Sequence, residues 1–310
     1  MRKRKIILDC DPGHDDAIAI MLAAKAQNLE LLGIGVSAGN QTLEKTGRNT
    51  LNLVQYLNID VPVALGNEFP LVKEPVICPE IHGETGLDGF TFPPLKRSFD
   101  KRSSHEMMRD LILKNKKVTL VSTGALTNIA TLLMKYPEVL PHIDELVMMG
   151  GAIEQGNVTP AAEFNIFVDP EAADYVFKSG LKIKMMGLDV TRHVKTYPSI
   201  VKRMEKIHNK ASDLFVALMK VFNANQKKMF GFKGGPLHDP VTIVYLIDRS
   251  VVTLKYMNTR IDVSKGISYG RTNCDQYGYM GLEPNSYVAV KINTKKYWDV
   301  IENILKGYSK

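Results

Sequence analysis

The sequence lacks the features that mark several broad classes of protein. Its 310 residues include only three cysteines, Cys10, Cys78 and Cys274, which are widely spaced and form no CxxC pair. An odd number of isolated cysteines argues against a disulfide framework and is typical of reduced thiols in the cytoplasm. No apolar run approaches the length of a membrane span, and the few apolar residues before Asp9 fall short of a signal sequence. We therefore expect a soluble cytoplasmic protein with no membrane partner.

Clustered positive charge is also missing, although the formal net charge is +7. The lysines are scattered, and the densest basic run is Arg2-Lys3-Arg4-Lys5 at the N-terminus. A nucleic-acid groove needs clustered positive charge, usually interleaved with aromatic residues. We interpret the basic residues as a solvated surface and expect no nucleic-acid partner.

What the sequence does contain is a regular alternation of strand-like and helical segments. Strand character is found in residues 6–8, 31–36, 61–65, 118–121, 145–149, 182–186, 252–263 and 286–292. Helical character is found in residues 17–24, 42–57, 128–136, 199–230 and 298–308, and Asp169-Pro170-Glu171 opens a further helix. There is no internal repeat and no low-complexity linker. The pattern predicts an α/β fold, with one domain over residues 1–310 and a mostly parallel, doubly wound central sheet flanked by helices.

Four acidic residues lie within eight positions, directly after the first apolar run. They are Asp9, Asp11, Asp15 and Asp16. One of Asp15 and Asp16 could serve as a helix N-cap, but four acids exceed what one cap needs. Buried carboxylates repel each other and resist desolvation unless positive charge lies among them. A hard divalent cation meets that need, so the cluster predicts a metal site.

Further polar residues follow the ends of later predicted strands. They are Asn40, Thr123, Glu163 and Asn165, joined by the pair His238-Asp239 before an apolar helix. Asn40 could be a simple turn residue, and His238 could be packed beside a helix cap. Because ligands bind beyond the carboxyl ends of the strands in an open parallel sheet, we expect these residues to share one active site there.

Five motifs, found in this order, resemble those of the inosine–uridine type nucleoside hydrolases. They are DCDPGHDDA at 9–17, AGNQT at 38–42, IHGETG at 81–86, AEFN at 162–165 and HDP at 238–240. The similarity spans nearly the whole chain. It implies Ca²⁺-dependent hydrolysis of the N-glycosidic bond of ribonucleosides in nucleoside salvage. It also implies one Ca²⁺ per subunit and a homo-oligomer, either a tetramer or a dimer.

The resemblance also implies roles for individual residues. Metal ligands would be the carboxylates of Asp11, Asp16 and Asp239 and the backbone carbonyl of Thr123, whose side chain would matter little. The ribose hydroxyls would be held by Asp15, Asn40, Asn157, Glu163 and Asn165. Asp11 is then the natural general base toward an activated water. His238, with a pKa expected near the working pH, would assist departure of the base.

The nucleobase preference rests on three further residues. His82 lies in a glycine-rich segment that we expect to form a mobile flap over the pocket. His14 is shared with pyrimidine-leaning bacterial relatives, and we expect it to orient its neighbours rather than to catalyse. Such relatives carry a tyrosine where Phe230 falls, so one proton donor is missing here, although Phe230 can stack on a base. We expect uridine and cytidine as preferred substrates and inosine as a weaker one.

Two other functions stay open on the sequence alone. A haloacid dehalogenase-type phosphatase also places Asp-x-Asp after its first strand, but Gly13 stands where Thr or Val is usual, and two extra acids would repel a phosphate. A non-catalytic Ca²⁺-dependent nucleoside- or ribose-binding module could use Asn40, Glu163 and Asn165 equally well. Release of ribose separates such a module from a hydrolase, because binding alone needs no activated water.

Overall fold

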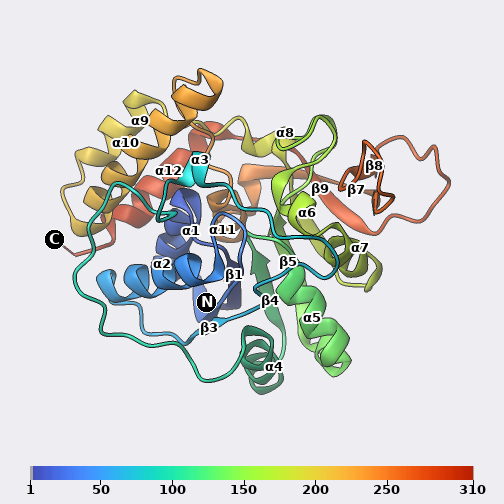
Figure 1. The fold of residues 1–310 in the computed structure, drawn as a ribbon. Helices are drawn as coiled ribbons and strands as arrows, with labels where there is room; N and C mark the ends of the chain where they lie inside the picture. Colours follow the sequence, from blue (N-terminus) through green and yellow to red (C-terminus); the bar gives the residue numbers. More distant parts are fainter. Residues whose placement is uncertain (1–2, 310) are drawn as a thin grey trace.

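The computed structural model describes residues 3–309, which form a nine-stranded sheet between two layers of helices (Figure 1). The strand order is β3-β2-β1-β4-β5-β6-β9-β7-β8. The strands are β1 (Arg4–Cys10), β2 (Leu29–Val36), β3 (Val63–Leu65), β4 (Val118–Ser122), β5 (Ile143–Met149), β6 (Ile183–Met186), β7 (Val252–Ile261), β8 (Thr272–Asp275) and β9 (Ser286–Ile292). In this spatial order, every neighbouring pair from β3 at one edge to β9 is parallel. Strand β7 is antiparallel to both of its neighbours, β9 and β8.

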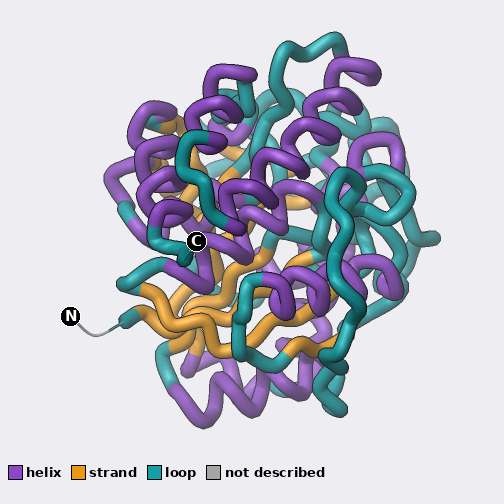
Figure 2. Tube along the Cα trace, turned by 90° about the vertical axis from the view of Figure 1, so that its left-hand side faces the viewer, coloured by secondary structure: helices purple, strands orange, loops and turns teal. Residues whose placement is uncertain are grey.

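The helices divide between the two faces of the sheet, which runs between them in Figure 2. One core contains buried residues of α1 (His14–Lys25), α2 (Leu43–Tyr56), α9 (Pro198–Glu205), α10 (Lys210–Phe230), α11 (Pro240–Ile247) and α12 (Thr294–Lys306). The other contains residues of α4 (Ser104–Asn115), α5 (Thr127–Lys135), α7 (Pro170–Lys178) and the 3₁₀-helix η1 (Pro137–His142). Short elements fill the loops: α3 (Pro79–His82), α6 (Phe164–Val168), α8 (Leu188–Thr191) and η2 (Arg249–Val251).

The predicted fold class is confirmed, with local differences. The segment 199–230 is two helices, because α9 ends at Glu205 and α10 begins at Lys210. Asn209 caps α10 by accepting hydrogen bonds from the amides of Ala211 and Ser212. Helix α4 and strand β8 were not predicted. The extent of one domain over residues 1–310 stays a prediction.

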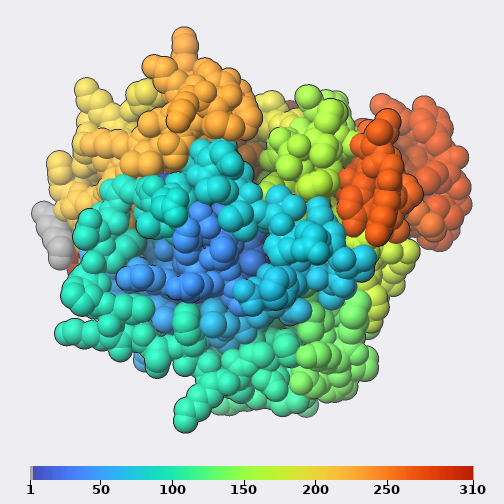
Figure 3. Space-filling view, viewed as in Figure 1, coloured from blue at the N-terminus to red at the C-terminus, as the bar shows by residue number. Residues whose placement is uncertain are grey.

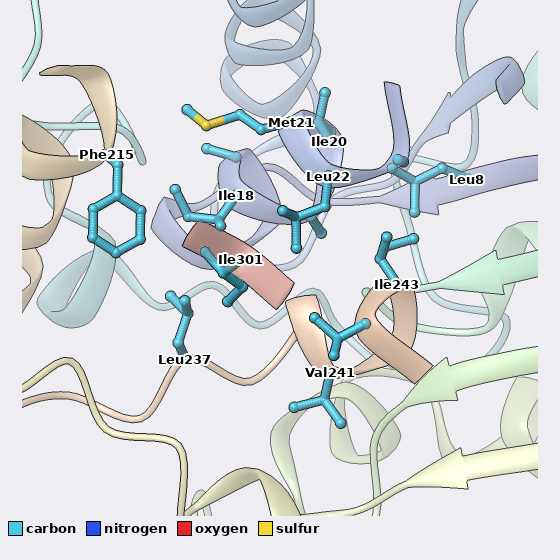
Figure 4. Close-up of a cluster of buried hydrophobic side chains, with 14 of the residues drawn as sticks. Leu8, Ile18, Ile20, Met21, Leu22, Phe215, Leu237, Val241, Ile243 and Ile301 are labelled. Atoms are coloured by element: carbon cyan, nitrogen blue, oxygen red, sulfur yellow. The ribbon is translucent and has the colours of Figure 1, made fainter. Parts of the chain in front are cut away.

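Helix α1 is held rigidly because it is apolar around its whole circumference. Residues 17–23 are all buried, as expected for a helix enclosed by the core. Figure 4 shows Ile18, Met21, Phe215, Val241 and Ile301, from α1, α10, α11 and α12, within one cluster of buried side chains. This packing fixes the first turn of α1, which carries Asp15 and Asp16.

The order of the strands identifies where a ligand should bind. Strand β1 lies between β2 and β4, and the chain reaches β4 only after passing α4 on the opposite face from α1. This is the topological switch point of a doubly wound sheet, where a crevice opens beyond the carboxyl ends of the strands. Asp11 follows β1 and Thr123 follows β4, so the acidic segment lies at that point.

The N-terminal basic run has a structural role in the part that is described. Arg4 donates hydrogen bonds to Thr119, Asp144 and the buried Glu145, which also pairs with Arg249. Arg2 lies outside the described residues. Within residues 3–309, no helix is both long enough and apolar enough to cross a membrane. Figure 3 shows that the segment between β7 and β9 projects at the right edge of the molecule.

Candidate active site

A cavity of about 620 Å³ opens at the switch point of the sheet. All seven residues predicted to bind substrate line it: Asp15, Asn40, His82, Asn157, Glu163, Asn165 and Phe230. Thr123, His238 and Asp239 line it as well, whereas Asp11 and Asp16 are fully buried beneath its surface. The structure thus brings together residues from segments that lie far apart in the sequence.

The most closely grouped acids are Asp15, Asp16 and Asp239, whose carboxylate oxygens lie within 4.8 Å of one another. Asp15 and Asp16 come from the first turn of α1, and Asp239 directly precedes α11. Neither Asp15 nor Asp16 is the N-cap of α1, because Gly13 occupies that position. Asp16 does accept a hydrogen bond from the Gly13 amide at 3.0 Å, so it combines a local structural role with its place in the cluster.

Asp11 is not a member of this trio. The three carboxylate metal ligands implied by the family resemblance were Asp11, Asp16 and Asp239, so Asp15 stands in the trio where Asp11 was expected. Oδ2 of Asp11 accepts a hydrogen bond from the Asn40 amide at 2.7 Å, and Oδ1 is buried without a partner in residues 3–309. A Cβ at Gly124 would lie 2.5 Å from Oδ1, and a Cβ at Gly39 would collide with Oδ2. Both glycines therefore let the backbone approach the Asp11 carboxylate closely.

Asp9, the fourth acid of the motif, belongs to a different environment. Its Oδ1 accepts a hydrogen bond from Asn128 Nδ2 at 2.8 Å, and its side chain does not line the cavity. Burial raises the pKa of Asp9 to about 7. Of the four acids in the motif, Asp9 therefore lies apart from the candidate metal site, where Asp15 and Asp16 meet Asp239 and Asp11 lies nearby.

Burial is the main reason that the clustered carboxyls resist ionisation. It raises the pKa of Asp11 and Asp239 well above the usual range, and repulsion from neighbouring acids raises both further. Burial and the Asp16 charge raise the pKa of Asp15 to about 7. Burial also raises the pKa of Asp16, against hydrogen bonds from Thr123 and Gly13. No lysine or arginine among residues 3–309 forms an ion pair with these carboxyls.

This donor set fits a hard divalent cation. The oxygens are buried, close together and anionic, and the unpartnered Oδ1 of Asp11 has an open coordination position. Carboxylate and carbonyl oxygens are the preferred ligands of Ca²⁺ and Mg²⁺. A bound cation would remove the electrostatic cost that raises the pKa of every carboxyl in the group.

The Thr123 side chain, expected to matter little, contacts the acid cluster directly. Its hydroxyl Oγ1 donates a hydrogen bond of 2.6 Å to Oδ1 of Asp16. Its carbonyl accepts a hydrogen bond from Asn165 Nδ2 at 2.8 Å and keeps a second lone pair for a ligand. Thr123 therefore orients an acid through its side chain as well as offering a backbone oxygen.

The loop after β5 supplies further residues that line the cavity. Glu163 caps α6, and its carboxylate accepts hydrogen bonds from the amides of Gly151, Asn165 and Ile166. Burial raises the pKa of Glu163 to about 7, against those three donors. Asn157 is exposed and accepts a hydrogen bond from the Phe164 amide. Asn40, which also lines the cavity, donates a hydrogen bond from Nδ2 to Asp16 Oδ2 at 3.0 Å.

His238 lies at the cavity with one ring nitrogen already engaged. Its Nδ1 is 2.7 Å from the hydroxyl Oγ1 of Thr191. Burial, followed by repulsion from Arg192, lowers the pKa of His238 to about 3. The expectation of a pKa near the working pH is therefore wrong for this site, because the ring lies in a cavity beside a guanidinium. The imidazole is neutral at neutral pH.

His82 and His14 form a buried, stacked pair with ring centroids 5.6 Å apart. The backbone amide of His14 donates to Nδ1 of His82, and Nε2 of His14 lies 2.8 Å from the carbonyl of Asp88. Burial lowers the pKa of His14 to about 4 and that of His82 well below its usual range. His82 lines the cavity and His14 does not. The orienting role expected of His14 stays a prediction. The mobility of the flap stays a prediction.

Several cavity residues were missed from the sequence, and one pattern could have revealed some of them. Phe222 and Gln226 were missed, and they precede the predicted Phe230 at intervals of four on α10, so the three share one helix face directed at the cavity. Gln226 is buried, and its Oε1 has no partner in the described chain. Phe230 stacks on Phe232 with ring centroids 5.4 Å apart.

The raised pKa values predict an unusual pH dependence of stability for the metal-free protein. The pKa values of Asp15 and Glu163, each about 7 when folded, exceed the unfolded values near 4. Between about pH 4 and 7 the folded protein therefore keeps these two carboxyls protonated, whereas the unfolded chain has lost the protons. The stabilisation that results is fully present below about pH 4 and is lost as the pH rises toward 7. We expect the Tm in EDTA to be about 5 °C lower at pH 7.5 than at pH 5. Thermal unfolding followed by circular dichroism measures this.

The matched control is Asp15→Asn, which removes one of the raised carboxyls. Its Tm in EDTA should depend less steeply on pH than that of the parent. A parent Tm that rises between pH 5 and 7.5 would contradict the assignment of these acids as protonated in the metal-free fold.

Comparison with known proteins agrees with this geometry. The sequence model for "Inosine-uridine preferring nucleoside hydrolase" matches residues 6–299. The pyrimidine-specific ribonucleoside hydrolase RihB of Escherichia coli is 46% identical over 311 residues, covering 100% of this chain and 99% of that protein. RihB of Escherichia fergusonii is equally similar. A purine-preferring ribonucleoside hydrolase from Gardnerella vaginalis superimposes with a TM-score of 0.92 at 31% identity, covering 98% of this chain and 99% of that one.

The family match spans nearly the whole chain, and the resemblance found in the sequence motifs is confirmed. On these grounds the chain belongs to the inosine–uridine preferring nucleoside hydrolase family.

Proposed function

We propose that this protein hydrolyses the N-glycosidic bond of pyrimidine ribonucleosides, uridine and cytidine, to ribose and free base, with one Ca²⁺ per subunit. The observation that carries the proposal is the buried acid cluster at a cavity of nucleoside size, lined by amides, carboxylates and histidines. The sugar would lie against the acids. The base would lie toward His238 and the aromatic residues of α10.

The metal proposal names four ligands. Asp11, Asp16 and Asp239 would supply carboxylate oxygens, and Thr123 would supply its backbone carbonyl. Asp15 is close enough to join or replace one of them, because its oxygen belongs to the 4.8 Å group. A bound Ca²⁺ supplies Lewis acidity that lowers the pKa of water and attracts a sugar diol.

The surrounding residues provide the rest of the chemistry. Cleavage places positive charge on the sugar and negative charge on the departing base, and buried carboxylates stabilise the oxocarbenium-like sugar. Asp15, Asn40, Asn157, Glu163 and Asn165 would hold the ribose hydroxyls. Asp11 would remove a proton from the attacking water.

His238 would act on the departing base. Because its imidazole is neutral, it would work as a hydrogen-bond donor through Nε2–H rather than as an imidazolium acid. Arg192 lies near enough to lower the pKa of His238, so it contributes positive potential at the same end of the cavity. Both effects favour a leaving group that gains negative charge.

A panel of nucleosides tests the substrate assignment. We expect kcat/KM for uridine and cytidine to exceed that for inosine by about tenfold or more, since a binding site of fixed shape distinguishes a small base from a larger one by about 1–3 kcal/mol. The support is the 46% identity to a protein named as pyrimidine-specific. The measurement is ribose release by a reducing-sugar assay, with adenosine as a further purine.

Each outcome of the panel has a separate meaning. Faster hydrolysis of inosine than of uridine would overturn the pyrimidine preference. Saturable uridine binding without ribose release would favour the binding module, and hydrolysis of 4-nitrophenyl phosphate with Mg²⁺ would favour the phosphatase.

We also propose that the protein acts in the cytoplasm as a homo-oligomer. The cysteines are free, in keeping with a reducing compartment. The segment that projects between β7 and β9 carries exposed apolar and aromatic side chains, among them Ile267, Tyr277 and Tyr279, which are candidates for a subunit contact.

A further inference from the structure

Thr191 lies directly behind His238, on the side away from the cavity. It is the last residue of α8, the short helix that follows β6, and its side chain is fully buried. Its hydroxyl Oγ1 lies 2.7 Å from His238 Nδ1, although the two residues are 47 positions apart. Thr191 itself does not line the cavity.

The position of this hydroxyl is set by the sheet. The Leu188 amide at the start of α8 donates to the carbonyl of Gly151 at 2.9 Å, which joins the ends of β5 and β6. The Thr191 amide donates to the carbonyl of Gly187 at 3.1 Å. A Cβ at Gly187 would lie 2.9 Å from that same Gly151 oxygen, so the close approach requires glycine. His238 is thus held from behind by a rigid element.

The other contacts of the Thr191 hydroxyl determine which of the two groups donates the proton in this hydrogen bond. Within residues 3–309 the Thr191 hydroxyl contacts no acceptor other than His238 Nδ1. If Nδ1 carried the proton and donated it to Thr191, the hydroxyl hydrogen would be buried with no acceptor, which is costly. If the hydroxyl donates to Nδ1, both groups are satisfied. A neutral imidazole then carries its proton on Nε2.

We propose that Thr191 is a positioning residue that holds His238 in the Nε2–H tautomer, so that the ring keeps a donor available to the departing base. The inference rests on the proposed role of His238. With the proton on Nδ1, Nε2 would present a lone pair to the cavity and would repel a leaving group that gains negative charge. Thr191 therefore acts through His238 and not on the substrate.

The test compares two substrates that differ in their need for a donor. Uridine requires help for its departing base, whereas 4-nitrophenyl β-D-ribofuranoside releases a stabilised phenolate. Partners that orient a functional histidine are typically worth about 10–100-fold in activity. We expect Thr191→Val to lower kcat on uridine by about that factor with KM little changed, and to change kcat on the nitrophenyl riboside by less than about threefold. Thr191→Ser, which keeps the hydroxyl, should restore most of the uridine activity.

The outcomes separate this inference from the proposed function. Equal losses on both substrates, or no loss on either, would overturn the role of Thr191. His238→Ala is the control: if it hydrolyses uridine at the parental rate, the role of His238 fails and this inference fails with it. If His238→Ala is slow on uridine and Thr191→Val is not, only the inference about Thr191 fails.

A spectroscopic measurement covers the case in which Thr191→Val does not fold. In the parent protein labelled with ¹⁵N-histidine, the two ring nitrogens of His238 have distinct chemical shifts that report the tautomer. His238→Ala identifies the signals. We expect a protonated Nε2 and an unprotonated Nδ1, and a protonated Nδ1 in the neutral ring would overturn the proposal.

Discussion

Replacing Asp11 with alanine is expected to lower kcat on uridine by about 10⁴-fold or more. General-base assistance alone is worth about 10²–10⁴-fold, and the same change removes a proposed metal ligand. The geometry adds to this, because Asp11 Oδ1 is buried with no hydrogen-bond partner among the described residues, and Oδ2 accepts a hydrogen bond from the Asn40 amide at 2.7 Å. Steady-state kinetics with saturating Ca²⁺ measure the effect.

The stability of the variant should move in the opposite direction. Burial and neighbouring acids raise the pKa of Asp11 well above its usual range, so its removal relieves repulsion in the metal-free fold. We expect Asp11→Ala in EDTA to unfold at a temperature no lower than the parent in EDTA. The exposed Asp144→Ala is a matched surface control and should leave kcat unchanged. Parental kinetics in a well-folded Asp11→Ala protein would contradict the assignment.

Removing divalent cations is expected to produce a similarly large loss of activity. A catalytic cation typically contributes several kcal/mol of transition-state stabilisation. Its removal therefore lowers the rate by about a hundredfold to a thousandfold or more. We expect EDTA to abolish uridine hydrolysis and excess Ca²⁺ to restore it. Mg²⁺ should restore less, because it demands octahedral geometry and gives up its waters reluctantly. Full activity after exhaustive chelation would rule out the metal.

The sequence was sufficient to predict the fold class, and to place several cavity residues at one edge of the sheet, because the signals were local. The roles of those residues stay predictions. Strand-like runs alternate with helical ones. Asp11 and Thr123 each follow a strand directly, and Asn40 lies in the loop after β2. In a parallel sheet that placement brings side chains to one edge whatever the details of the loops. The acid motif after β1 adds a second local signal, because its charge cannot be buried without compensation.

The hydrogen bonds and pKa shifts within the site depend on which distant residues the fold brings together, and no local sequence pattern encodes that. Thr123 orients Asp16, from which it is separated by 107 positions, and Thr191 reaches His238 across 47. The pKa of His238 depends on Arg192 and on the depth of the cavity, so a typical histidine value did not apply. Asp15 joined the closest acid trio because the first turn of α1 faces Asp239, which is contributed by a distant loop.

Calcium binding to the metal-free protein tests the central claim most directly. Isothermal titration should give one saturable site per chain in the parent, and affinity lowered by about a hundredfold or more in Asp239→Asn, since affinity follows the charge of the ligands. A parent protein that binds no calcium yet hydrolyses uridine at full rate would contradict the account.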